Sequence, residues 1–392
     1  MKKQNKATSV LLGLAALVCV GLCALLLPWL ATRVGADTGS KAAGPKSAAE
    51  VVTAYEMDVN NLISSALSEL EELPVVIPRK VYVLSEDTVI APKPDPARFG
   101  SSSDPADTVP VMEAAAELMG EERFLWDPST ETLSGSTVRW YLDDTICSIS
   151  WKELVNSRSV YSFTEVKVAH PSQFRRYLAD NTFANPIQYL PTELAKTVNA
   201  VTAMNGDFYK HRKIGTVVYN RTLYRLDSQY LDTCFIDTAG DLNFVRSGAL
   251  PTEEAVNQYV AENDILFSLA FGPVLIEEGV DVCPAGYLIG EVTAAYSRAA
   301  ICQLGPCHYL LVTVNHDSGY SGVATIRTLT DHLMQKGVPN AYCLDGGQTS
   351  TMIVGGELFN RPDWGAERAV SDIIYFATAI PESEWNGGEE EG

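Results

Sequence analysis

The longest apolar stretch of the chain is an uncharged run, Val10–Ala31, preceded by three lysines within the first six residues and followed by Arg33. A helix over this run would span about 33 Å at 1.5 Å per residue, enough to cross a hydrocarbon core of roughly 30 Å. The lysine excess on its N-terminal side predicts a cytoplasmic N-terminus. We therefore expect residues 1–36 to be a single-pass anchor in the cell membrane, with the folded part extracytoplasmic. Cleavage near Ala36, which would give a secreted form, is the alternative.

A helical pattern follows a Gly/Ala/Lys/Ser-rich linker. Apolar residues recur every three or four positions over residues 48–73, without Pro or Gly. The pattern suits a stalk helix that self-associates as a short coiled coil, or a helix packed on its own domain. Changes in composition then divide the chain into a linker and stalk (37–74), an N-terminal extension packing on the core (75–150), a main domain (151–380) and an acidic disordered tail (381–392).

Two short apolar runs, Tyr309–Val314 and Ala341–Leu344, read as buried strands. Between them an amphipathic pattern predicts a helix over 326–336, capped by Thr325 and stopped by Gly337. Strand, helix and strand at this spacing predict a β-α-β unit with parallel strands. The fold class is therefore α+β or mixed α/β, with a mixed sheet, a β-α-β unit and flanking helices. Asp317 and Asp345, which follow the two strands, should share one edge of the sheet, where such sheets place ligands.

Further turns and strands surround this unit. Val198–Met204 predicts a strand that ends in Asn205-Gly206-Asp207, and Thr351–Phe359 predicts a hairpin around Gly355-Gly356. An extended region contains the strand-like Lys80–Leu84, and residues 101–110 read as a loop.

The charge balance narrows the function. With Lys+Arg 29 against Asp+Glu 49, the formal net charge is −20, which argues against a nucleic-acid partner. The densest basic cluster, Lys210-His211-Arg212-Lys213, is either a solvated loop or a site that recruits an anion.

Six cysteines lie beyond the apolar N-terminal run, without a spacing typical of zinc sites. Cys302 and Cys307 flank a Gly-Pro turn and are the leading candidates for a disulfide in an exported domain. The alternative is that most of the six are small buried apolar residues. Cys343, in a predicted buried strand, should be inaccessible in either case.

Several motifs in consistent order resemble the phosphodiester glycosidase family. They are Asn205-Gly-Asp-Phe-Tyr209, Phe271-Gly-Pro-Val-Leu-Ile276, Arg298-Ala-Ala-Ile301, Leu344-Asp-Gly-Gly-Gln-Thr-Ser-Thr-Met352 and Asn360-Arg-Pro362. Gln348 and Thr349 stand where the family usually has Gly and Ser. The resemblance covers roughly residues 195–380 and implies hydrolysis of the glycosidic bond of a sugar-1-phosphodiester. Many bacterial members are described as exopolysaccharide-related, so an envelope glycopolymer is the expected partner.

The resemblance and the strand ends together give the candidate site. The expected catalytic carboxylates are Asp345, Asp207 and Asp317; the expected substrate-binding residues are Asn205, Gly206, Arg298, Gly346, Gly347, Thr349, Ser350, Asn360 and Arg368. No cofactor is indicated. Two other classes stay open: a glycopolymer-binding protein without activity, and a phosphodiesterase whose aspartates hold a divalent cation.

Overall fold

The computed structural model describes residues 82–120, 124–183, 188–211, 213–227, 229–287, 292–316 and 323–385, which all belong to one compact unit, Arg79–Gly392. The expected membrane anchor, the 48–73 helix and most of the acidic tail lie outside these residues. Within the described ranges, no helix combines the length and the apolar character needed to cross a membrane.

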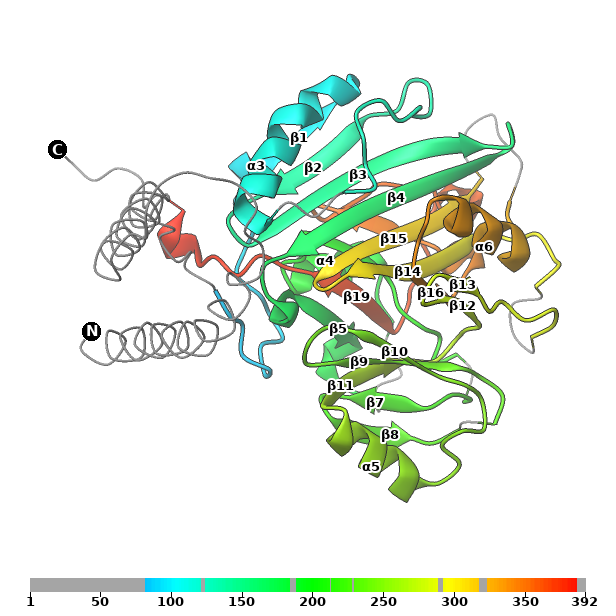
Figure 1. The fold of residues 1–392 in the computed structure, drawn as a ribbon. Helices are drawn as coiled ribbons and strands as arrows, with labels where there is room; N and C mark the ends of the chain where they lie inside the picture. The colour runs from blue at the N-terminus through cyan, green and yellow to red at the C-terminus, as the bar shows by residue number, and fades with distance from the viewer. Residues whose placement is uncertain are drawn as a thin grey trace, which may run out of the picture. The chain divides into compact units, whose positions relative to one another are not determined.

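A nine-stranded sheet forms the centre of the fold (Figure 1). Every neighbouring pair in it is antiparallel. In spatial order its strands are β1 Phe99–Ser102, β2 Val138–Leu142, β3 Ile146–Val155, β4 Ser159–Val168, β15 His308–Asn315, β14 Arg298–Gly305, β16 Asn340–Leu344, β12 Val274–Glu277 and β13 Val280–Asp281. The expected N-terminal extension thus adds strands to the same sheet, and β3 runs across its expected end at residue 150.

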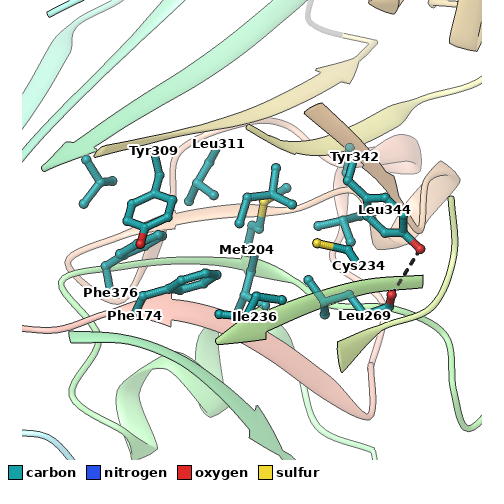
Figure 2. Close-up of a cluster of buried hydrophobic side chains, with 14 of the residues drawn as sticks. Phe174, Met204, Cys234, Ile236, Leu269, Tyr309, Leu311, Tyr342, Leu344 and Phe376 are labelled. Carbon is teal, nitrogen blue, oxygen red and sulfur yellow. Dashed lines mark hydrogen bonds between the residues drawn. The ribbon is translucent and has the colours of Figure 1, made fainter. Parts of the chain in front are cut away.

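A five-stranded antiparallel sheet packs against one face of the large sheet. Its strands in spatial order are β18 Glu357–Leu358, β17 Met352–Val354, β6 Thr202–Asn205, β19 Asp372–Phe376 and β5 Phe174–Leu178. Side chains alternate along the strands, so that Tyr309 and Leu311 of β15 meet Phe174 and Phe376 in a shared core (Figure 2). This sandwich holds the ends of β6, β14 and β16 in fixed positions.

Helices cover the outer faces. Helix α6 (Ile326–Gln335) packs on the far face of the large sheet through Ile326, Leu329 and Leu333, and α4 (Pro191–Thr197) covers the five-stranded sheet. The remaining elements are α3 Val109–Met119, the sheet β10 Leu242–Val245, β9 Thr233–Asp237 and β11 Ile265–Leu269, the helix α5 Glu253–Glu262, and the hairpin β7 Val217–Tyr219 with β8 Thr222–Arg225.

The fold is a mostly β, mixed α+β architecture, which confirms the coarse fold class. The β-α-β unit needs correction. Strands β15 and β16 are parallel to each other, but β14 lies between them and pairs antiparallel with both. No parallel pair occurs among the described strands, so the predicted mixed sheet is wrong. The sequence between 298 and 305 supplies the inserted strand, which local strand-helix-strand spacing cannot reveal.

Most local predictions around this unit are confirmed. Thr325 caps α6 by accepting a hydrogen bond from the Thr328 N–H at 2.9 Å, and β17 and β18 form the hairpin around Gly355-Gly356. The other strands and loops fit less well. The strand expected at 198–204 begins only at Thr202, residues 82–84 are irregular, and the loop expected at 101–110 includes the end of β1 and the start of α3.

The six cysteines of the described residues form no disulfide with one another. Cys302 lies in the core beneath α6, whereas Cys307 packs against the core between the two sheets. The predicted Cys302–Cys307 disulfide is therefore wrong, because the two side chains belong to opposite faces of the large sheet. Cys343 is fully buried, as predicted.

Candidate active site

A pocket of about 290 Å³ opens at the edge of the large sheet where β14 begins and β16 ends. The register explains its position: Arg298 opens β14 opposite Val314, and the next residue, Ala299, lies opposite Leu344, the last residue of β16. The lining residues are Phe208, His211, Phe271, Tyr296, Ser297, Arg298, Asp345, Gly346, Gly347 and Arg368. The structure thus brings together one of the predicted carboxylates, both predicted arginines and two predicted glycines.

Asp345 is the carboxylate of this pocket. Its Oδ2 accepts a hydrogen bond from Thr349 Oγ1 at 2.9 Å, and its backbone carbonyl accepts one from Asn205 Nδ2 at 2.8 Å. Burial raises the pKa of Asp345 to about 6, although the Thr349 bond and the nearby Arg368 oppose the rise. A carboxylate in this range exchanges protons near neutral pH, as a general acid or base must.

The two glycines after Asp345 let the chain turn tightly against β14. A side chain at Gly346 would collide with the Ser297 carbonyl, and Gly347 has a positive φ of 64°. The Gly347 N–H donates to the Ser297 carbonyl at 2.9 Å, and the Gly346 N–H bonds the Asp345 carboxylate. These two N–H groups therefore hold the loop in place, and the pocket's donors for an anion are the arginines.

The two arginines differ in how they are held. Arg298 is buried; its Nε and Nη2 donate to the carbonyls of Ala324 and Ala294 at 3.1 and 2.6 Å. Its guanidinium also lies over the Tyr296 ring, 5.3 Å from the centroid. Arg368 is exposed, and in the part of the chain that the structure describes it makes no hydrogen bond or ion pair. One cation is fixed in the wall, and the other stands at the opening.

The predicted Asn, Ser and Thr residues lie behind the pocket and fix its loop. Asn205 accepts from the Thr351 N–H at 3.1 Å while it donates to Asp345, and Ser350 Oγ donates to the Arg298 carbonyl at 2.6 Å. Asn360 Nδ2 bridges the Ser350 carbonyl and Asn315 Oδ1, at 2.8 and 2.6 Å. Their polar groups are used within the protein, so they position the site rather than face the pocket.

Asp207 does not line the pocket but lies in a buried ion-pair cluster with Arg176 and Asp372. Arg176 Nη2 lies 2.9 Å from Asp207 Oδ1 and 2.8 Å from Asp372 Oδ2, and all three side chains are inaccessible. Asp207 also accepts hydrogen bonds from the N–H groups of Tyr209 and Ala270, at 2.7 and 2.9 Å. Burial raises the pKa of Asp372 against the opposing effect of Arg176. Gly206 completes the cluster, since a side chain there would collide with Asp372.

A family model of phosphodiester glycosidases matches residues 198–377, which include every described residue of the pocket and of the loop behind it. Residues 198–377 are a phosphodiester glycosidase domain. The resemblance read from the motifs is thereby confirmed. No curated protein sequence matches the chain.

Solved structures similar to this chain share little sequence with it. The catalytic domain of zebrafish N-acetylglucosamine-1-phosphodiester alpha-N-acetylglucosaminidase, auto-inhibited by its pro-peptide, has 18% identity and a TM-score of 0.47, covering 59% of this chain and 83% of that one. A hypothetical Synechocystis protein has 15% identity and a TM-score of 0.43, covering 62% and 66%. A putative exported protein from Burkholderia pseudomallei has 12% identity and a TM-score of 0.39, covering 56% and 74%.

Further residues that line the pocket or support it were not among the predicted site residues. Phe208 and Phe271 form one wall of the pocket in an edge-to-face pair, 4.9 Å between centroids. Arg176 lies in the fully buried strand β5. A charged residue within an otherwise buried strand requires a partner of opposite charge, and this requirement could have pointed to the ion-pair cluster from the sequence. His211, from the basic cluster, lines the pocket. Asp317 lies outside the described residues.

A larger cavity, about 900 Å³, is lined by residues of the edge strand β1, its neighbour β2 and helix α4. Its single acidic side chain, Glu357, pairs with Arg139 at 3.3 Å. We place the candidate active site in the smaller pocket, where a carboxylate with a raised pKa faces arginines.

Proposed function

We propose that the domain hydrolyses the glycosidic bond of a sugar-1-phosphodiester, with Asp345 as the essential carboxylate. The observation that carries this proposal is the meeting of Asp345, with its pKa raised to about 6, and two arginines in one pocket of a phosphodiester glycosidase domain. The pocket thus offers a carboxylate that can take a proton from the water attacking the sugar carbon, and positive charge that can bind the phosphate.

The leaving group makes a single carboxylate sufficient. Cleavage at the anomeric carbon expels a phosphate monoester, whose second pKa is about 6. Such a group leaves with little protonation, whereas the alcohol released by an ordinary glycosidase requires a second carboxylic acid. Asp345 then serves as general base: it accepts a proton from the water that attacks the anomeric carbon.

The arginines would hold the phosphate before and after the bond breaks. Arg298 is fixed by two backbone carbonyls and the Tyr296 ring, so its charge is pre-organised for the anion. Among the residues that the structure describes, Arg368 makes no hydrogen bond or ion pair, so its guanidinium donors are available to an anion. The edge-to-face pair Phe208 and Phe271 provides an apolar wall for the sugar ring.

The sequence supports a further part of the proposal, the cellular setting. The uncharged Val10–Ala31 run would anchor the protein and hold the domain outside the cytoplasm. There the substrate would be an envelope glycopolymer or an exopolysaccharide that carries phosphodiesters. Membrane fractionation of the full chain tests this part, and recovery of a mature protein that begins at Asp37 in a soluble fraction would contradict it.

Product analysis in ¹⁸O-labelled water tests the reaction. The substrates are methyl diesters of several α- and β-hexose-1-phosphates, and the Asp345→Asn protein is the control. We expect free sugar that carries ¹⁸O on its anomeric carbon and an unlabelled methyl phosphate, because water attacks carbon.

The two other classes give different results in the same assay. Label in the phosphate, with activity that a chelator removes, would identify a metal-dependent phosphodiesterase. In the described ranges, no three His, Cys, Asp or Glu side chains come together as a set of metal ligands. Measurable binding of the diesters without turnover would instead indicate a glycopolymer-binding protein.

A further inference from the structure

The loop between β18 and β19 forms one side of the pocket's opening and is fixed at several points. Asp363 Oδ1 accepts from Ser297 Oγ at 2.5 Å, the Ala366 carbonyl accepts from Gln348 Nε2 at 3.2 Å, and Glu367 accepts from Thr192 Oγ1 at 2.5 Å. Two of these donors belong to the segments that build the pocket. The loop's position is therefore tied to the pocket wall.

Two side chains of this fixed loop, Trp364 and Arg368, project into solvent. Trp364 is 89% exposed, more than any other large hydrophobic residue in the described ranges. Its backbone has a positive φ of 63°, a conformation that bulky residues rarely adopt. The 3₁₀ turn that carries it (Asp363–Gly365) contacts the turn Gly347–Thr349 directly after Asp345. An exposed indole on a backbone of this unusual conformation, next to the turn that follows Asp345, is suited to contact a bound ligand.

A second exposed aromatic residue stands on the β14 side of the opening. Tyr296 lines the pocket, is 51% exposed and lies under the Arg298 guanidinium. It precedes Ser297, whose hydroxyl holds Asp363 beside Trp364. Tyr296 and Trp364 thus flank the Ser297–Asp363 bond, one on each of the segments that it joins.

The size of the pocket explains what such a surface would bind. At about 290 Å³ the pocket lies at the lower limit of ligand cavities, roughly 300–1,000 Å³. It can enclose one sugar ring beside the arginines, so the group on the other side of the phosphate must lie outside. The apolar C–H face of a pyranose ring stacks on an aromatic ring, whereas a small alkyl group would leave both rings uncovered.

We propose that Trp364 and Tyr296 form an aromatic platform that binds a second sugar ring, the one esterified to the phosphate. This inference rests on the proposed function, because it assigns the pocket to the first sugar and the arginines to the phosphate. It assigns to Trp364 and Tyr296 the discrimination between a diester with a second sugar and a diester with a small alcohol.

The test compares two substrates with the same hexose-1-phosphate, one esterified to methanol and one to a second hexose. We call the diester with the second hexose the disaccharide substrate. We expect the wild-type kcat/KM to be about tenfold higher for this substrate than for the methyl diester, the usual scale of one aromatic contact. Trp364→Asn removes the ring and retains a residue type that tolerates a positive φ; we expect the ratio to fall to about one. Trp364→Phe should keep most of the preference.

Tyr230→Ala is the matched control, since Tyr230 is 50% exposed and does not line the pocket. It should leave the ratio unchanged. An equal loss on both substrates in Trp364→Asn, or an unchanged ratio, would overturn the platform.

A binding measurement separates this inference from the proposed reaction. Non-hydrolysable phosphonate analogues of both substrates are titrated calorimetrically into the Asp345→Asn protein with and without Trp364→Asn. The platform predicts about tenfold weaker binding of the disaccharide analogue alone, even if no substrate is turned over. Failure of the disaccharide analogue to bind more tightly than the methyl analogue would refute the platform and leave the reaction to the product analysis.

Discussion

Asp345 and Asp207 follow buried strands in similar sequence contexts, yet the structure surrounds them differently. Asp345 directly follows β16 and faces a pocket, with one hydroxyl bond, nearby arginines and a pKa raised to about 6. Asp207 comes two residues after β6 and is enclosed, with Arg176 and two backbone N–H groups as partners. One carboxylate has room for a substrate, and the other has none.

The difference shows that a carboxylate's surroundings decide its role. A buried carboxylate with a cation and N–H donors is a stable structural anion, because its charge is compensated. Asp207 thereby ties the segment after β6 to β5 and β19 through Arg176 and Asp372, and it holds the backbone N–H groups of Tyr209 and Ala270. Asp345 is only partly compensated, and that leaves it able to exchange a proton.

The largest expected effect is on turnover. Asp345→Asn should lower kcat by about 10²–10⁴-fold, the usual contribution of a positioned general base. Above pH 6 Asp345 carries a buried charge that destabilises the folded state, since burial raises its pKa to about 6. The Asn variant lacks this charge, so its Tm at pH 7.5 should equal or exceed that of the wild type. Steady-state kinetics and thermal unfolding of the same preparation check both.

Asp207→Asn is the contrasting variant. It should lower the Tm clearly, while kcat measured well below that Tm falls much less than in Asp345→Asn. The reverse pattern would assign catalysis to Asp207 and refute the comparison.

The sequence predicts Asp345 better than the rest of the site, for physical reasons. Apolar runs and the Thr325 cap are local signals, so β15, α6 and β16 and the carboxylate that follows β16 could be located. The pairing of Arg176 with Asp207 and Asp372 joins residues far apart in the chain, and no local pattern encodes it. The insertion of β14 between β15 and β16 is equally non-local, although it brings Arg298 beside Asp345.

The buried cluster should dominate stability. Arg176→Met removes the ion-pair partner of two buried carboxylates and should cost about 3–5 kcal/mol of unfolding free energy. Urea unfolding measures the loss. Arg221→Met is the matched control, because its ion pairs with Glu86 and Asp264 are exposed and should contribute less than about 1 kcal/mol. Equal losses of unfolding free energy in the two variants would mean that the buried cluster stabilises the fold no more than an exposed ion pair does.

The pH dependence sharpens the role of Asp345. A general base works as the carboxylate, and the pKa of Asp345 is raised to about 6. We therefore expect kcat to be constant above pH 7 and to fall about tenfold per pH unit well below pH 6. Initial rates between pH 4.5 and 8.5, with folding checked by circular dichroism at each pH, give the profile. Activity that instead disappears as the pH rises through 6 would make Asp345 a general acid.

The smallest expected effect separates the two arginines. Arg368 is exposed, so its attraction for an anionic substrate is screened by salt, whereas Arg298 is buried and held by backbone carbonyls. Arg368→Gln should raise KM several-fold at low ionic strength, with little change in kcat, and the difference from the wild type should shrink at about 0.5 M NaCl, where the Debye length is only a few ångströms. Arg298→Gln should raise KM at both salt concentrations, because its contact with the phosphate excludes water and mobile ions.

KM measured for the methyl diester at 20 mM and 0.5 M NaCl in the three proteins distinguishes these outcomes. Identical salt responses in the two variants would show that the arginines meet the phosphate in the same environment, contrary to their different burial.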